Sequence, residues 1–212
     1  TVGQQPGTVK NRDAFAADLT AVLRDAWGNH ASADSSSTVT AQLFDSTGSS
    51  VGAESAAVTA ASGTVTFTGL SFNAAPASGY QVKFKLVSNS ATVTSNAFTI
   101  NPGDATQLVI VRSPASVEAD SSTTKTGNVL PTQPIVKLLD QDNYLVTTAN
   151  SGAATIRIKS GPGGNLTEGV TTANFVGGIA NFAGVVLVGT PGVNYTFDFA
   201  TASPNPALTS GV

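Results

Sequence analysis

Four segments of the chain alternate apolar and polar residues, the period of a β-strand that buries one face and exposes the other to water. Short clusters of Gly, Pro, Asn and Ser separate these segments and predict turns between them. We therefore expect an all-β chain of short antiparallel strands. The four segments are residues 38–44, 64–72, 80–86 and 154–159.

The chain contains one domain-sized pattern twice. The run Leu23–Asn29 aligns with Leu138–Tyr144 at a shift of 115 residues, and this shift continues for roughly sixty residues, so that Phe67 meets Phe182. Upstream, residues 5–9 align with residues 113–117 at a shift of 108. The second copy therefore carries an insertion, which we place in the polar loop at residues 120–126 because polar loops tolerate insertions.

This repeat predicts two domains, residues 1–102 and 103–212. About seven short strands in ~100 residues are typical of an immunoglobulin-like (Ig-like) antiparallel β-sandwich. Residues 13–24 have a helix-like pattern, but their counterparts include Pro131 and Pro134, so we expect a strand there. Tyr80 and Tyr195 recur after a turn, where many sandwiches place a tyrosine whose hydroxyl bonds the backbone upstream; a plain core tyrosine is the alternative. The expected core residues are Leu19, Leu23, Val39, Leu43, Val65, Phe67, Leu70, Tyr80, Val82 and Phe84 in copy one, and Leu138, Ile156, Ile158, Phe182, Val185, Tyr195, Phe197 and Phe199 in copy two.

Four motifs of the chain resemble the bacterial Ig-like (filamin-like) repeats of large adhesins, S-layer-type proteins and other extracellular repeat proteins. These motifs lie at Leu23–Asn29, Ser160–Leu166, Gly178–Val185 and Gly192–Phe197. The resemblance covers nearly the whole chain and implies the sandwich fold. It says less about function, because such repeats serve as spacers and interaction modules in different contexts. Copy two departs from the pattern at Asn143 and Tyr144, where the family favours Gly and Asn.

The two copies differ at their ends. Copy one closes with residues 93–100, a predicted last strand, whereas the equivalent run of copy two, residues 208–212, is shorter. Copy two opens with Ala105–Leu108, which has no counterpart in copy one. One explanation is that the sequence, which also lacks Met, is an excerpt of a longer array. The other is that a neighbouring chain supplies the missing strand, with Leu208 and Thr209 at the interface.

The amino-acid composition excludes several classes of function. Charged residues make up only 11% of the chain, and the net charge of −3 gives no basic surface for nucleic acid. Cysteine is absent, which excludes disulfides and thiolate chemistry. No apolar run reaches the ~18 residues of a membrane span, so we expect no membrane insertion.

Candidate chemistry is sparse. Asp25, Asp34, Asp140 and Asp142 are candidate Ca²⁺ ligands, because carboxylates in turns supply the oxygens that calcium prefers; structural turn residues are the alternative. We expect no other cofactor. The sole histidine, His30, has no evident catalytic partners. Trp27 either stacks on a sugar or a partner, or folds over the end of the sandwich. Asn165 and Asn194 each begin a glycosylation sequon.

We therefore expect a non-catalytic structural module of an extracellular or cell-surface assembly, such as a surface layer, an adhesin stalk or a filament. Its partners would be copies of itself or neighbouring repeats, joined through incomplete edge strands. A carbohydrate- or surface-binding adhesive module, or an accessory domain of a secreted hydrolase, is the alternative.

Overall fold

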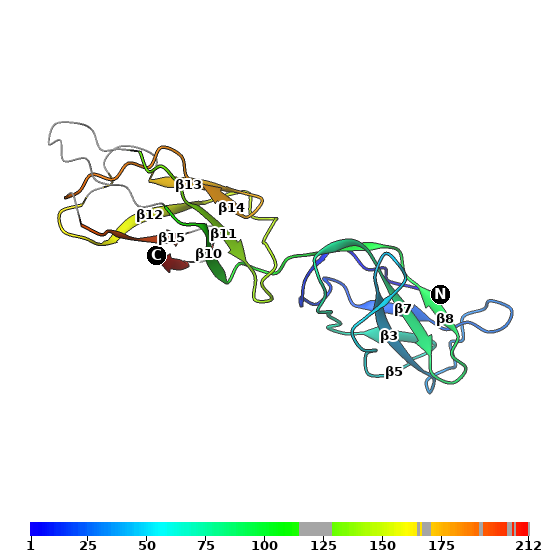
Figure 1. Cartoon of the computed structure of the whole chain (residues 1–212). Coiled ribbons are helices and arrows are strands. Elements are labelled where there is room, and N and C mark those ends of the chain that lie inside the picture. Colours follow the sequence, from blue (N-terminus) through cyan, green and yellow to red (C-terminus); the bar gives the residue numbers. More distant parts are fainter. Residues whose placement is uncertain are drawn as a thin grey trace. The chain divides into compact units, whose positions relative to one another are not determined.

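The fold is all-β. A computed structural model describes residues 1–114, 129–164, 166, 171–190, 193–202, 205 and 207–211 (Figure 1), and these residues contain strands and turns but no helix. The same residues accordingly include no helix of the length and apolarity that a membrane span requires. The chain forms two compact units, unit 1 (Thr1–Gly103) and unit 2 (Asp104–Val212). The predicted insertion at residues 120–126 and the sequon at Asn165 lie outside the described residues.

Unit 1 packs two sheets against each other in a β-sandwich-like arrangement. The larger sheet has the order β1-β9-β7-β3-β4, with β5 beside β3 and β8 beside β7, and the smaller sheet pairs β2 with β6. Phe67 of the small sheet lies 5.3 Å from Phe84 of the large sheet between ring centroids. The strands are β1 (Val9–Lys10), β2 (Leu19–Val22), β3 (Thr38–Phe44), β4 (Ser50–Val51), β5 (Val58–Thr59), β6 (Thr64–Phe67), β7 (Ala77–Leu86), β8 (Thr92–Thr94) and β9 (Phe98–Asn101).

Unit 2 has one continuous sheet path, β10-β11-β14-β13-β12-β15-β16. The strand β13 makes this path continuous, because its first half pairs with β12 and its second half with β14. Phe182 and Phe199 meet edge to face in the core. The strands are β10 (Gln107–Arg112), β11 (Ile135–Leu139), β12 (Ala153–Ser160), β13 (Thr172–Val176), β14 (Ile179–Asn181), β15 (Thr196–Thr201) and β16 (Thr209–Gly211).

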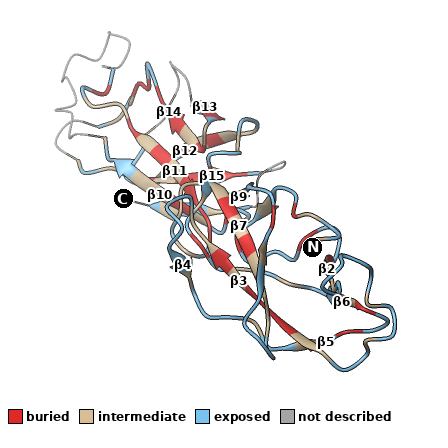
Figure 2. Cartoon of the chain, turned by 90° about the vertical axis from the view of Figure 1, so that its right-hand side faces the viewer, coloured by how far each residue is buried: buried red, intermediate tan, exposed pale blue. Residues whose placement is uncertain are grey.

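The alternating pattern produces the buried faces of the long strands. In Figure 2 buried positions follow β3 and β7, while most of the connecting loops are exposed. Fourteen of the eighteen predicted core residues are buried, and the remaining four, Leu23, Leu70, Ile158 and Tyr195, pack against the cores half-buried. The strand predicted in residues 13–24 is confirmed as β2, which pairs with β6.

Two predicted strands are shorter than the pattern indicated. The segment 64–72 stops as a strand at Phe67, because Asp18 accepts hydrogen bonds from Thr68 Oγ1 and from the backbone N–H of Gly69, which has a φ of +66°. The run 93–100 is divided between β8 and β9. The buried Ser95 separates the two strands, and its hydroxyl accepts a hydrogen bond from the backbone N–H of Val82.

Both repeated tyrosines bond the backbone five residues upstream. The Tyr80 hydroxyl donates to the carbonyl of Ala75 at 2.7 Å. The Tyr195 hydroxyl accepts from the N–H of Thr190 at 2.7 Å and donates to the carbonyl of Pro162 at 2.8 Å. The predicted hydrogen bond to the upstream backbone is therefore confirmed for both residues. In unit 2 the tyrosine hydroxyl also bonds a second loop, the one that contains Pro162.

Candidate functional site

Asp25 and Asp140 organise the same turn in both units. Asp25 Oδ1 accepts the backbone N–H groups of Trp27 and Asn29, at 2.9 and 2.8 Å. Asp140 Oδ1 accepts those of Asp142 and Tyr144, both at 2.9 Å. The left-handed position of this turn holds Gly28 (φ +85°) in one unit and Asn143 (φ +66°) in the other. Asparagine tolerates this conformation better than most residues, which explains why Asn143 can stand where unit 1 has Gly28.

The carboxylates of Asp25 and Asp34 in unit 1 accept hydrogen bonds from residues of their own loops. Hydrogen bonds from the side chain and backbone of Ser37, followed by the backbone of Ser36, lower the pKa of Asp34 to about 2. The side chain and then the backbone of Asn29 lower the pKa of Asp25. Within the described ranges, no three His, Cys, Asp or Glu side chains gather into a group that could hold a metal. The structure thus supports a turn role for Asp25, Asp34 and Asp140, and calcium binding at these residues or at Asp142 stays a prediction.

Trp27 projects from the first of these turns. Its side chain is 86% exposed, so the alternative in which it folds over the end of the sandwich is wrong. His30 lies at the end of the same turn, where its backbone forms an isolated antiparallel β-bridge with Arg24, and its side chain is also exposed. This placement leaves the Trp27 ring available to stack on a ligand or a partner, on a turn whose backbone Asp25 holds in place.

The two edge residues predicted in unit 2 have different surroundings. Leu208 is half-buried against the unit's own core, and its carbonyl accepts the N–H of Thr201 at 2.9 Å. Thr209 is exposed on β16, the last strand of the sheet, where it pairs with Ala200. Thr209 is therefore the more accessible of the two to an added strand.

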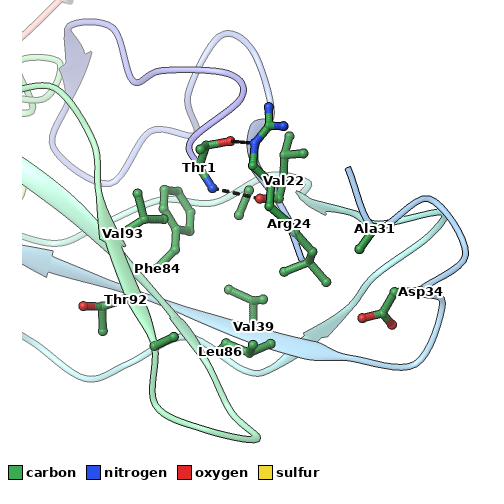
Figure 3. Close-up of a pocket in the computed structure, with 13 residues that line it drawn as sticks. Thr1, Val22, Arg24, Ala31, Asp34, Val39, Phe84, Leu86, Thr92 and Val93 are labelled. Carbon is green, nitrogen blue, oxygen red and sulfur yellow. Dashed lines mark hydrogen bonds between the residues drawn. The ribbon is translucent and has the colours of Figure 1, made fainter. Parts of the chain in front are cut away.

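Unit 1 also contains an apolar groove of about 300 Å³ that the sequence analysis did not predict. Val39 and Phe84 lie at its base, and Thr1, Arg24 and Asp34 lie at its rim (Figure 3). The signal that could have revealed it was the Ala105–Leu108 segment of copy two, which has no counterpart in copy one. Recognising the groove required the strand register, which the sequence pattern does not give.

No protein-family model matches this chain, and no curated protein matches it in sequence.

Proposed function

We propose that this chain is a non-catalytic structural module of an extracellular bacterial assembly, formed by two tandem Ig-like β-sandwich domains. The observation that carries the proposal is that the two units repeat the same hydrogen bonds 115 residues apart. Leu23 N–H donates to Gly63 carbonyl at 2.8 Å, and Leu138 N–H donates to Gly178 carbonyl at 2.8 Å. The Asp25 and Asp140 turns repeat in the same way.

A duplicated unit with a core of its own suits a repeat array. Each unit buries its own cluster of apolar side chains, so length can be added by adding units. The charged fraction of 11% limits repulsion between neighbouring copies in a surface lattice or a filament. A surface layer, an adhesin stalk and a filament all use these properties.

Subunits would associate by adding a strand at the edge of β16. Thr201 and Leu208 form a hydrogen-bonded pair, and hydrogen-bonded and non-bonded pairs alternate along an antiparallel ladder. The next pair, Ala200 and Thr209, is therefore a non-bonded pair, and the N–H of Thr209 points away from β15. An N–H directed outward from an edge strand is the group that strand addition uses.

Location and assembly can be tested together. Antibodies raised against the chain should label the surface of the source cells in immunogold electron microscopy, and negative staining should reveal ordered polymers or a lattice. Label confined to the cytoplasm would refute the proposal.

Strand addition has its own test. Thr209→Pro removes the outward N–H and should abolish polymers while the unit stays folded, whereas Thr209→Ala keeps the N–H and should assemble normally. Polymers that persist in Thr209→Pro would exclude addition at this edge, although an array built through other contacts would remain.

A second candidate function, an adhesive module that binds carbohydrate, is favoured by the exposure of Trp27. An exposed indole on a fixed turn can stack on the apolar face of a sugar ring. Binding on a glycan array that Trp27→Ala abolishes, and that Trp27→Phe partly retains, would establish this function. Equal binding by the wild type and Trp27→Ala would reject it.

A further inference from the structure

One face of the unit 2 sheet carries a row of apolar side chains. The strands β10, β11, β14 and β13 are neighbours in this part of the sheet (Figure 1). Their register places Val109 opposite Lys137, Lys137 opposite Ile179, and Ile179 opposite Val176. Opposed residues on one face have Cβ atoms ~5 Å apart, so these four side chains form a continuous row. We call Val109, Lys137, Ile179 and Val176 the apolar row, since the lysine contributes its aliphatic stem.

The apolar row faces away from the core of unit 2. Leu108, Val136 and Ala180, which neighbour the row along their strands, belong to the core. Successive side chains of a strand point to opposite faces, so the row lies on the outer face of the sheet. Ile179 is accordingly half-buried, and Val176 is 73% exposed.

Unit 1 has small or polar residues at the matching positions. At the shift of 115, Ile179 corresponds to Thr64 and Val176 to Ala61. The backbone is the same in both units, because Thr64 pairs with Ala61 as Ile179 pairs with Val176. The fold therefore does not require large aliphatic side chains there. A contiguous exposed apolar surface that the fold does not require marks an interaction site.

Trp27 is a second position at which the units differ, and here unit 1 carries the apolar residue. Its counterpart in unit 2 is Asp142. The turn that presents Trp27 is fixed, because the N–H of Trp27 donates to Asp25 Oδ1 at 2.9 Å and Arg24 Nη1 donates to the carbonyl of Gly28 at 2.8 Å. An exposed ring on a fixed turn loses little conformational entropy when it binds.

The Trp27 turn and the apolar row complement each other in shape and charge. Three strand spacings of ~4.8 Å give the row a length of about 14 Å, which accommodates an indole ring. The Lys137 ammonium at its middle attracts the face of an aromatic ring, and tryptophan is the ring that attracts a cation most strongly. The Asp25 carboxylate lies in the same turn as Trp27 and supplies a negative charge. Two identical rows packed on each other would instead oppose their lysines, which disfavours a symmetric contact.

We propose that Trp27 of one copy of this chain docks on the apolar row of a second copy. The proposal rests on the function proposed above and names a contact between its subunits. Because the ring belongs to unit 1 and the row to unit 2, the contact is head-to-tail. Each docked pair keeps one free Trp27 and one free row, so further copies can add at both ends. The interface is small, so a single contact is weak and an array gains from many of them.

The test uses two variants that each lose one half of the contact. The ring variant is Trp27→Ala, and the row variant combines Val176→Thr with Ile179→Thr, the residue type that unit 1 has at Thr64. Trp27 is the only tryptophan of the chain, so in a mixture of the two variants the tryptophan fluorescence comes from the row variant alone. Adding the ring variant should shift this emission to shorter wavelength until it saturates. Sedimentation of the mixture should show dimers and no larger species, because neither free end can bind.

Self-association gives the magnitude and the controls. In sedimentation equilibrium, the ring variant and the row variant alone should each associate at least about tenfold more weakly than the wild type. Lys137→Glu should weaken association similarly, whereas Lys137→Arg keeps the cation and should retain it. Val188→Thr replaces an exposed valine outside the row and should associate as the wild type does.

Three results would overturn the proposal. The first is an unchanged Trp27 emission when the ring variant is added to the row variant. The second is a wild-type emission already at short wavelength and independent of concentration, because Trp27 would then be covered within its own chain. The third is an emission shift caused by a glycan but not by the ring variant, which would assign the ring to carbohydrate binding.

These outcomes are separate from those of the function proposed above. Surface labelling of the cells does not depend on Trp27 or on the apolar row, so its failure leaves the mixing experiment unaffected. Polymers that form normally in the row variant would refute this contact while the structural function stands. Thr209→Pro changes neither half of the contact, so it tests strand addition alone.

Discussion

Replacing Tyr195 by phenylalanine should destabilise unit 2 more than Tyr80→Phe destabilises unit 1. The ring stays in both variants, so only hydrogen bonds of the hydroxyl are lost. Tyr195 loses one bond to Thr190 and one to Pro162, whereas Tyr80 loses the bond to Ala75. A net contribution of ~0.5–1.5 kcal/mol for each bond sets the scale of these losses.

The expected costs follow from the surroundings of each partner. Thr190, Pro162 and Ala75 are exposed, so water replaces part of each lost bond and the lower half of the range applies. We expect Tyr195→Phe to cost about 1–2 kcal/mol and Tyr80→Phe about 0.5–1 kcal/mol. In a domain of this size, 1 kcal/mol shifts the melting temperature by ~4–8 °C.

The assay is native-state hydrogen exchange, which reports the two units separately through the slowest-exchanging amides of β12 and β3. Tyr144→Phe is the matched control, since no side-chain hydrogen bond of Tyr144 occurs among the described residues, and it should leave both units unchanged. If Tyr195→Phe proved as neutral as Tyr144→Phe, ring packing alone would hold this loop, and the reasoning from the paired hydrogen bonds would be wrong.

Three further predictions concern the turns. Asp34→Asn should flatten the fall in melting temperature between pH ~4 and ~2: the folded pKa of about 2 lies below the unfolded value of ~3.9, so the ionised carboxylate stabilises the fold above pH ~4 and this contribution is lost as the pH falls towards 2. A wild-type curve identical to that of the variant would contradict this. Gly28→Val should lower the urea midpoint by the equivalent of about 1–2 kcal/mol because φ is +85°, whereas Gly28→Asn, the residue type found at Asn143, should cost less than half as much. Millimolar Ca²⁺ or EDTA should leave the melting curve unchanged, because backbone amides already occupy Oδ1 of Asp25 and Asp140; a calcium-induced rise that Asp142→Asn removes would establish the site.

Fourteen of the eighteen core residues that the sequence pattern predicted are buried, because burial in a strand has a period of two and because the pattern occurs twice. The buried residues Phe15, Phe98 and Ile100 were not among the predicted core residues, because the aligned stretch of the two copies did not include them. Phe98 and Ile100 have no partner in copy two, and Phe15 corresponds to Leu130 upstream of the aligned stretch. The structure shows that Phe15 and Leu130 occupy equivalent positions. The N–H of Phe15 donates to the carbonyl of Leu70, and the N–H of Leu130 donates to the carbonyl of Val185, 115 residues after Leu70.

Features that depend on tertiary contacts could not be predicted. The alternation continues past Phe67, but Asp18, which lies 51 residues before Gly69, accepts a hydrogen bond from the backbone N–H of Gly69 and ends the strand. The exposure of Trp27 and the groove beside Leu23 likewise depend on which segments meet in space. A hydrophobic pattern identifies which face of a strand is buried but not which segment covers it.

Positions at which the two units differ indicate where their interactions differ. Leu23 and Leu138 make the same hydrogen bond in the two units, and the turn that follows keeps its left-handed position even though Gly28 of unit 1 corresponds to Asn143 of unit 2. In contrast, Arg24 and Asp34 are charged where unit 2 has Leu139 and Ala149, and both lie at the rim of the groove. Charge at an exposed rim contributes little to the stability of a fold. The rim of the groove therefore carries charges that have no equivalent in unit 2, while its base is formed by the buried core residues Val39 and Phe84.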